Sequence, residues 1–197
     1  MTSDQQAAFN KAWQELELAV TKRNHEFRLA VVANNIVHGS DARTVVLRHA
    51  NQHQRTLRFS SDQRSNKFDN INSGDPLIWV FYSPTLRTQI RATGICTIHT
   101  QGELFETAWH ETHLISRRCY LAESAPGSPV SNPDDGYPGF LQDREPTEEE
   151  SEAGKPNFCV IVTEINSFDI YLLDVKGHRR CHYAFSDPEW SAQWLMP

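Results

Sequence analysis

Basic and polar residues recur at spaced positions in the first half of the chain, and together they could hold an anion. Residues 43–48 (RTVVLR) form an apolar strand core between two arginines, Arg43 and Arg48. A second group follows on a predicted short helix and a later strand: Arg64, Ser65, Lys67 and Gln89. Arginine and lysine bind phosphate groups through charge-assisted hydrogen bonds, so this pattern favours a phosphate-bearing ligand.

One cofactor whose chemistry matches these residue types is FMN. It carries a phosphate dianion, a hydroxylated chain, and a flat ring whose pyrimidine edge becomes negative on reduction. Such a ligand needs two or three cationic side chains, small hydroxyls beside them, and an amide or other donor at the ring edge. The chain offers a set of this kind: Arg43, Arg48, Ser60, Arg64, Ser65, Lys67 and Gln89. Residue types alone do not separate FMN from another phosphate ligand.

Length and charge restrict the remaining possibilities. The 197 residues fit one domain, 1–197, and can bury a sizeable core. The net charge of -6 gives no global positive field to attract nucleic acid or an anionic membrane surface. We therefore expect the basic residues to act locally on a small-molecule ligand, with no nucleic-acid or membrane partner.

Cysteine usage and the N-terminus indicate a cytoplasmic protein. The four cysteines are widely spaced, without a CxxC pair, and each lies in or beside an apolar run: Cys96, Cys119, Cys159 and Cys181. This pattern is typical of reduced core thiols in a cytosolic protein. The polar N-terminus has no apolar segment of the signal-peptide type, and no run approaches the length of a membrane span.

The elements that must position these residues are mostly strands. Residues 76–82 (PLIWVFY) are almost continuously apolar, which predicts a central strand buried on both faces. Alternation over 87–100 puts Gln89 and Arg91 on the face that is available to a ligand. Further strand patterns occur at 27–33, 43–49, 55–60, 158–165, 168–173 and 179–185.

Three helices are predicted beside the strands. Apolar residues at one-face spacing predict an N-terminal helix over about 3–23, with Ser3 or Asp4 as N-cap. A short helix within 61–73 and a longer one over 103–121 follow. Because most strands are joined by short turns, the pattern predicts a mainly β fold, an antiparallel β-barrel with peripheral helices. Residues 124–156 hold six prolines and an acidic run, and we expect a long loop there without regular structure.

The ordered motifs resemble the FMN-binding split barrels related to pyridoxamine 5'-phosphate oxidase. Residues 43–48 are similar to the family's R-x-V-L-L-K strand, and Phe59-Ser60 to its aromatic-Thr pair. Residues 64–67 are similar to its S-R-K segment, and 87–94 to its R-Q-V-x-V-x-G strand. The chain's end, from Trp190 to Pro197, resembles the closing W-x4-L-x-P. Order and spacing agree over about 27–121 and 158–197, with the features of a divergent branch.

This resemblance implies a fold, a cofactor and a set of contacts. The fold is an antiparallel, Greek-key-like split barrel, which forms a homodimer with two FMN sites at the subunit interface. The implied cofactor contacts are Arg43, Val45, Val46, Leu47, Arg48, Phe59, Ser60, Arg64, Ser65, Lys67, Gln89 and Tyr171. Asn66 stands where the family has an arginine, and Arg64 is the candidate replacement for that charge.

The substrate side resembles the family less closely. Arg179 matches the arginine of the family's R-x-H pair, whereas Cys181 replaces its histidine. The implied substrate contacts are Arg48, Ser116 and Arg179, with Arg179 as the catalytic candidate. Two of the family's phosphate ligands fall near Trp109 and His113, which are different residue types. We therefore expect an FMN-dependent oxidoreductase whose substrate, of the pyridoxal phosphate type or otherwise, stays open together with its electron acceptor.

Other readings of the sequence remain. Residues 110–113 (HETH) lack the histidine spacing of a zinc helix, so no metal site is predicted. A non-catalytic flavin- or haem-binding protein is the main alternative, because split-barrel relatives include such proteins. A purely structural dimer is the third.

Overall fold

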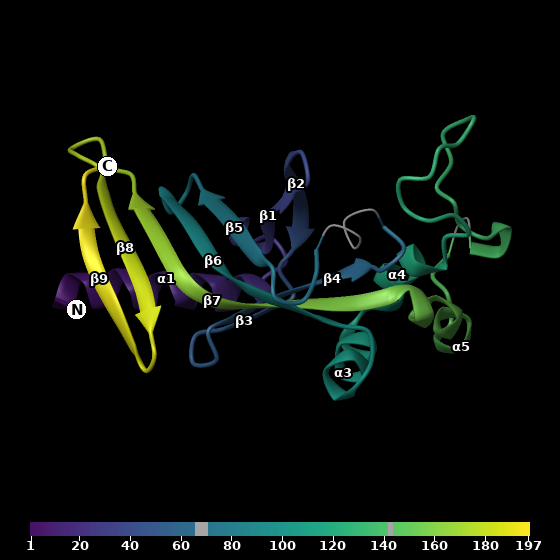
Figure 1. Cartoon of the computed structure of the whole chain (residues 1–197). Helices are drawn as coiled ribbons and strands as arrows, with labels where there is room; N and C mark the ends of the chain where they lie inside the picture. Colours follow the sequence, from purple (N-terminus) through teal and green to yellow (C-terminus); the bar gives the residue numbers. More distant parts are fainter. Residues whose placement is uncertain (66–70, 142–143) are drawn as a thin grey trace. The chain divides into compact units, whose positions relative to one another are not determined.

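The protein has a mainly β structure, seen in a computed structural model that describes residues 1–65, 71–141 and 144–197 (Figure 1). Seven strands follow one another in the order β2-β1-β5-β6-β7-β4-β3, and the β8–β9 hairpin pairs with β7. The strands are β1 Leu29–Ile36, β2 Gly39–Val46, β3 His49–Asn51, β4 Thr56–Asp62, β5 Pro76–Ser83, β6 Thr88–His99, β7 Phe158–Leu172, β8 Arg179–Ser186 and β9 Glu189–Leu195.

The strand pairs whose register is described are all antiparallel. Across the described residues, the main strand path runs from β2 to β3 without closing on itself, as in a split barrel. The prediction of an antiparallel, mainly β fold with peripheral helices is confirmed. The α-helices are α1 Ser3–Thr21, α3 Glu103–Glu111, α4 Leu114–Arg117 and α5 Glu148–Ser151, and the short 3-10 helices are η1 Glu26–Arg28, η2 Arg118–Leu121, η3 Gly139–Leu141 and η4 Glu152–Asn157.

The chain divides into two compact units. Unit 1 comprises Met1–Phe59, Ser73–Thr97 and Val162–Pro197. Unit 2 comprises Ser60–Asn72 and Ile98–Ile161.

Helix α1 is held in unit 1 by its apolar face. Phe9, Trp13 and Leu16 are almost completely buried, as their spacing predicts. The ring centroids of Trp13 and Phe168 on β7 lie 4.9 Å apart, and the Tyr183 hydroxyl on β8 donates to the Gln5 carbonyl at 2.8 Å. Burial of each large apolar side chain contributes about 2 kcal/mol. The N-cap is Thr2, which forms a capping box with Gln5, and not Ser3 or Asp4.

Strand β5 is central in unit 1 but is buried on one face only. Leu77, Trp79 and Phe81 are completely buried, whereas Ile78 is 42% and Tyr82 is 53% exposed. The expectation of burial on both faces was wrong for the isolated chain, because no layer of unit 1 covers the second face. An uninterrupted apolar run therefore marks an uncovered apolar face here.

Strands β6 and β7 approach each other very closely at Gly94. A Cβ atom at this position would lie 2.0 Å from the Glu164 carbonyl oxygen and 2.8 Å from the Ile165 Cα. Glycine is required because any side chain would collide with the backbone of β7. The close approach fixes how the two strands lie side by side.

The first hairpin differs in its turn from the predicted one. Leu29 pairs with Val46 and Ile36 pairs with Gly39, so the chain turns at Val37 and His38. Gly39 begins β2, whereas the predicted strands at 27–33 and 43–49 left residues 34–42 for the connection. Strand β3 (His49–Asn51) is a separate short strand paired with β4.

Unit 2 has an aromatic core. Phe105 and Trp109 on α3 pack against Phe158, with ring centroids 5.5 and 5.2 Å away, and Tyr120 lies 5.1 Å from Phe158. The helix predicted over 103–121 is interrupted at Thr112, whose N–H donates to the Trp109 carbonyl at 3.0 Å. Beyond the break, Ile115 is 40% exposed and Cys119 is exposed, although Cys119 was predicted to be a core thiol.

The proline-rich and acidic segment ends in regular structure. Thr147 and Glu150 form a capping box that begins α5, and η4 follows it directly. The expectation that no regular element forms within 124–156 was therefore wrong at its C-terminal end, and also at the short 3-10 helix η3. The capping box allows a helix to begin despite the proline-rich and acidic composition, because it satisfies free N–H groups of the first turn.

The cysteines are free, and Cys96, Cys159 and Cys181 are buried as predicted, whereas Cys119 is exposed. No helix in the described part of the chain is long and apolar enough to span a membrane.

Candidate functional site

Gln89 and Tyr171 lie opposite each other on neighbouring strands of unit 1. The Leu173 N–H donates to the Arg87 carbonyl at 2.8 Å, and four residues along β6 the Arg91 guanidinium donates to Asp169. Both contacts obey the same antiparallel register, and this register places Gln89 midway between them, beside Tyr171. Two residues predicted to meet the flavin are thus brought together from β6 and β7.

This face of β6 and β7 also carries an ion cluster. Asp169 accepts hydrogen bonds from Arg91, and from Arg180 on β8 at 2.7 and 3.0 Å. Burial raises the pKa of the Asp169 carboxyl, but the hydrogen bonds from Arg180 and Arg91 outweigh it, so the pKa lies below its ordinary value. Two arginines and one carboxylate leave a net positive charge next to the Gln89–Tyr171 pair.

The Gln89 amide and the Tyr171 hydroxyl are free to contact a ligand. Neither group has a hydrogen-bond partner among the residues that the structure describes, and both side chains are half-buried. The Tyr171 ring lies 6.1 Å from the ring of His178. An amide donor, a hydroxyl and a nearby positive charge suit the edge of a ring that gains negative charge.

The side chains of the β2 segment that was predicted to line the flavin point to different sides of the sheet. Arg43 pairs with Asp41 and donates to the Asn34 side chain, so its charge is already partly compensated. Val46 lies opposite Leu29 on the exposed sheet face, whereas Val45 and Leu47 point into the core. The Arg48 N–H donates to the Arg58 carbonyl at 2.8 Å, which ties the end of this segment to β4.

Phe59 belongs to the core of unit 1, where its ring centroid lies 5.5 Å from that of Trp79. Its burial positions the backbone of β4 and leaves the side chain itself little surface for a cofactor.

Ser60, Arg64 and Ser65 lie in unit 2. Ser60 is half-buried on β4, and the Ser65 hydroxyl donates to the Asp62 carbonyl at 2.7 Å. The Arg64 guanidinium binds the Asp62 carboxylate at 2.8 and 3.1 Å and the Ala122 carbonyl at 2.9 Å. A phosphate would therefore compete with Asp62 for Arg64. Lys67 and Asn66 lie outside the described residues.

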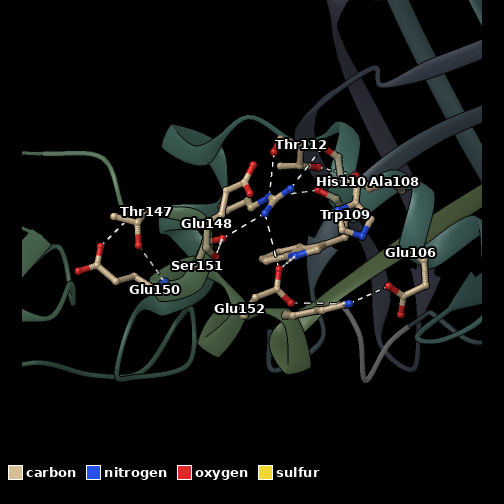
Figure 2. A network of polar contacts seen from close by, with 12 residues as sticks. Glu106, Ala108, Trp109, His110, Thr112, Thr147, Glu148, Glu150, Ser151 and Glu152 are labelled. Atoms are coloured by element: carbon tan, nitrogen blue, oxygen red, sulfur yellow. Dashed lines mark hydrogen bonds and ion pairs between the residues drawn. The ribbon is translucent and has the colours of Figure 1, made fainter.

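Of the positions similar to the family's substrate-phosphate ligands, Trp109 lies in a closed polar network of unit 2 (Figure 2). Trp109 is completely buried and donates its ring N–H to Glu152 at 2.7 Å. Arg117, which is 4% exposed, donates to the carbonyls of Trp109 and Thr112 and to the Ser151 hydroxyl, at 3.0 to 3.1 Å. His113 is exposed and Ser116 is half-buried.

Arg179 lies on the other face of the β7–β8 pair. Its strand partner is Leu172, whereas Tyr171 is opposite Arg180. Because side chains alternate along a strand, Arg179 points to the α1 side, and Arg180 lies on the face of Gln89 and Tyr171.

Asp169 and Arg180 were not among the predicted site residues. Their sequence signal is the pair Arg179-Arg180 at the start of a strand, in which one of the two arginines must face each side of the sheet. Which one meets Asp169 depends on the register of the β7–β8 hairpin.

The open antiparallel sheet, with peripheral helices and a polar patch on the outer face of β6 and β7, is that of a split-barrel protein. Residues 5–100, just under half of the chain, match the family model described as the FMN-binding domain of pyridoxamine 5'-phosphate oxidase. No curated protein matches the chain in sequence.

Solved structures with the same fold cover nearly the whole chain. An FMN-binding protein related to pyridoxamine 5'-phosphate oxidase, from Nostoc punctiforme, is 24% identical, with a TM-score of 0.71 and coverage of 95% of this chain and 96% of the other. PhzG from Burkholderia lata, solved in complex with tetrahydrophenazine-1-carboxylic acid, is 14% identical, with a TM-score of 0.68 and coverage of 96% and 92%. A general stress family protein from Xanthomonas campestris is 11% identical, with a TM-score of 0.56 and coverage of 88% and 92%.

Proposed function

We propose that this protein is an FMN-dependent oxidoreductase. The observation that carries the proposal is the family match over residues 5–100, which includes the predicted cofactor segments at 43–48, 59–60, 64–67 and Gln89. The family domain binds FMN, and the residue types at these positions fit its phosphate, ribityl chain and ring.

The chain's own residues bind and polarise the cofactor. Ser60, Arg64 and Ser65 contact the phosphate side, with Lys67 as a further cation, and Arg43 and Arg48 bracket the strand that lines it. Gln89 donates to the ring edge and Tyr171 borders the ring. Bound FMN supplies the capacity to accept a hydride equivalent. The net positive charge of the Arg91–Asp169–Arg180 cluster favours the anionic reduced ring electrostatically.

The substrate is a small molecule, and pyridoxamine or pyridoxine 5'-phosphate is the first to test. Of the candidate contacts Arg48, Ser116 and Arg179, the last faces α1, away from Gln89 and Tyr171, which leaves Arg48 and Ser116. The network around Trp109 argues for a departure from that substrate. Trp109 has its ring N–H engaged by Glu152 and is shielded from solvent, so it offers no donor to a substrate phosphate. The absence of this phosphate donor favours the alternative function, a non-catalytic flavin- or haem-binding protein.

We also propose a homodimer formed through the uncovered face of the unit 1 sheet. This apolar sheet face is defined by Leu29, Val31, Ile78, Tyr82 and Ile95, which are between 40% and 57% exposed. The registers β1–β5 and β5–β6 place all five on one side of the sheet. A group of exposed apolar side chains of this kind is typical of a protein interface. Gln89 lies opposite Tyr82, so the candidate flavin residues border the same surface.

The decisive experiment is titration of the purified protein with FMN, followed by flavin fluorescence. Saturable binding with one FMN per chain supports the proposal, and an absence of binding contradicts it. Reduction of the bound flavin by NADPH in a stopped-flow instrument, followed by reoxidation in air, then separates an enzyme from a carrier. Formation of pyridoxal phosphate under air tests the first substrate. A Soret band on addition of haem would favour the alternative function.

A further inference from the structure

Unit 1 contains a cavity between α1 and the sheet. It has a volume of about 370 Å³, which lies within the range of small-molecule sites. Helix α1 contributes Ala8 and Ala12, and the opposite wall comes from Ile170 and Leu172 on β7 and Trp194 on β9. All of these residues belong to the same compact unit.

The cavity exists because α1 presents small side chains to this part of the sheet. Phe9, Trp13 and Leu16 fill the core along one stripe of the helix, whereas Ala8 and Ala12 lie on the neighbouring stripe, where no side chain reaches across the gap. Phe27 closes one wall and is completely buried. The walls are thus mainly apolar and suit an apolar body of one or two rings, or a short alkyl chain.

One cation of the cavity is unpaired. Arg179, at the start of β8, lines it, and its guanidinium has no hydrogen bond or ion pair with any residue in the described part of the chain. The second cation, Lys11, is paired with Glu15, which also receives a hydrogen bond from His25 at 2.9 Å. The charge left for a ligand is therefore a single planar guanidinium.

This charge pattern selects a monoanion. A guanidinium binds a carboxylate through two parallel hydrogen bonds. Glu15 is already paired with Lys11, but Asp4 also lines the cavity, so a second negative charge on the ligand would be repelled by Asp4. Apart from the Lys11–Glu15 pair, a phosphate dianion would find one cation, Arg179, and one carboxylate, Asp4.

The cavity is separate from the candidate flavin residues. Arg179 and its strand partner Leu172 face α1, whereas Tyr171 and Arg180 occupy the other face of the same two strands. Thr88, which lines the cavity, directly precedes Gln89, whose side chain points to the opposite side of β6. A ligand under α1 therefore does not occupy the place of the ring edge.

From these observations, we propose that the cavity under α1 is a second ligand site, which binds an apolar carboxylic acid with its carboxylate on Arg179. Its body lies between Ala8, Ala12 and Trp194. The site does not require FMN.

The test is isothermal titration of the full-length protein with 2-naphthoate, with and without saturating FMN. We expect 1:1 binding of equal affinity in both cases and at least tenfold weaker binding of the neutral 2-naphthamide. Arg179→Met should weaken naphthoate binding at least tenfold. Ala8→Phe, which fills the cavity from a half-buried position, should abolish it while the circular dichroism spectrum stays that of the parent protein.

The matched control is Arg23→Met, an exposed arginine outside the cavity, which should leave the affinity unchanged. Absence of naphthoate binding, or binding that Arg179→Met does not weaken, overturns the proposal. Equal affinity for the amide contradicts the role of the carboxylate. Competition between naphthoate and FMN would show that the two ligands share one site, and it would overturn the proposal that the cavity binds its ligand independently of FMN. A protein that fails to bind FMN but binds naphthoate as expected contradicts the proposed function alone.

Discussion

Gln89 is the side chain on which the proposed flavin chemistry depends most directly. Its amide has no partner among the described residues, so replacement removes a ligand contact without leaving an internal group unsatisfied. We expect Gln89→Ala to weaken FMN binding about 3- to 10-fold, the value of one hydrogen bond. The midpoint potential of bound FMN should fall, because the reduced ring loses a donor.

Fluorescence titration and spectroelectrochemistry measure these two effects. Gln193→Ala is the matched control, because Gln193 is exposed on β9. Unchanged affinity and potential in the Gln89 variant would show that Gln89 does not reach the ring.

Asp169 should make the stability of the protein depend on pH. Its pKa is depressed in the folded protein, since the hydrogen bonds from Arg180 and Arg91 exceed the effect of burial. The ionised carboxylate therefore stabilises the fold above its unfolded-state pKa, and this contribution is lost as the pH falls through the lower folded-state pKa. At pH 7 we expect Asp169→Asn to reduce the free energy of unfolding by about 1–3 kcal/mol.

Urea unfolding at pH 7 and at pH 3 tests this sign. The difference between the parent protein and Asp169→Asn should shrink below about pH 4, where the carboxyl begins to protonate. Glu189→Gln, an exposed acid on β9, should cost less than about 0.5 kcal/mol at either pH. A difference that grows at low pH would contradict the assignment.

At the scale of elements, Arg117 joins the helices of unit 2. Its guanidinium binds α3 through the Trp109 carbonyl and binds α5 through Ser151, and it lies 4.8 Å from the centroid of the Trp109 ring (Figure 2). Arg117→Met keeps the length of the side chain but leaves these buried acceptors unpaired. We expect a loss of about 2–4 kcal/mol in the free energy of unfolding.

The same variant should expose the segment around α5 to proteolysis, which limited digestion and mass spectrometry can detect. Arg144→Met is the control, because Arg144 forms an exposed ion pair with Glu150 and should matter by less than about 0.5 kcal/mol. If Arg117→Met digests and unfolds as the parent protein does, the network does not hold α5 in place.

The elements with strong local signals could be predicted from the sequence. The spacing of Phe9, Trp13 and Leu16 defines α1, and alternation defines β6. The break at Thr112 and the capping box at Thr147 were missed, because each depends on one or two local hydrogen bonds within a segment of contrary average composition. The exposure of one face of β5 was missed, because an apolar run does not show whether another layer of the fold covers each face.

The candidate site could be predicted only in part. Motif order leads to Gln89 and Tyr171 separately, but their adjacency follows from the β6–β7 register, which the sequence does not reveal. Arg64 and Arg43 have the charge that a phosphate needs, yet the structure pairs them with Asp62 and Asp41. Each partner lies two residues before its arginine, within strand β2 for Asp41 and at the end of β4 for Asp62, and a search for basic residues does not find such pairs.

At the scale of the whole molecule, the apolar sheet face is a surface that no layer of unit 1 covers. Leu29, Val31, Ile78, Tyr82 and Ile95 together form a surface that a monomer would expose to water. A twofold-symmetric dimer buries the same face on both chains at once. Gln89 and Tyr171 border this face, so assembly would also enclose the proposed ring edge, and cofactor affinity should depend on dimer formation.

Ile78→Glu tests this dependence. A carboxylate in the middle of the face would be buried without a partner, so we expect a dimer to become a monomer in size-exclusion chromatography with light scattering. FMN affinity should fall at least tenfold in the same variant, because each site loses the partner chain. Val175→Glu is the matched control, since Val175 is 84% exposed in the β7–β8 turn, and it should change neither property. A parent protein that is monomeric, or an Ile78→Glu variant that stays dimeric, would contradict the proposed interface. If the Ile78→Glu variant is monomeric but binds FMN with unchanged affinity, the proposed interface stands, and the complete cofactor site lies within one chain.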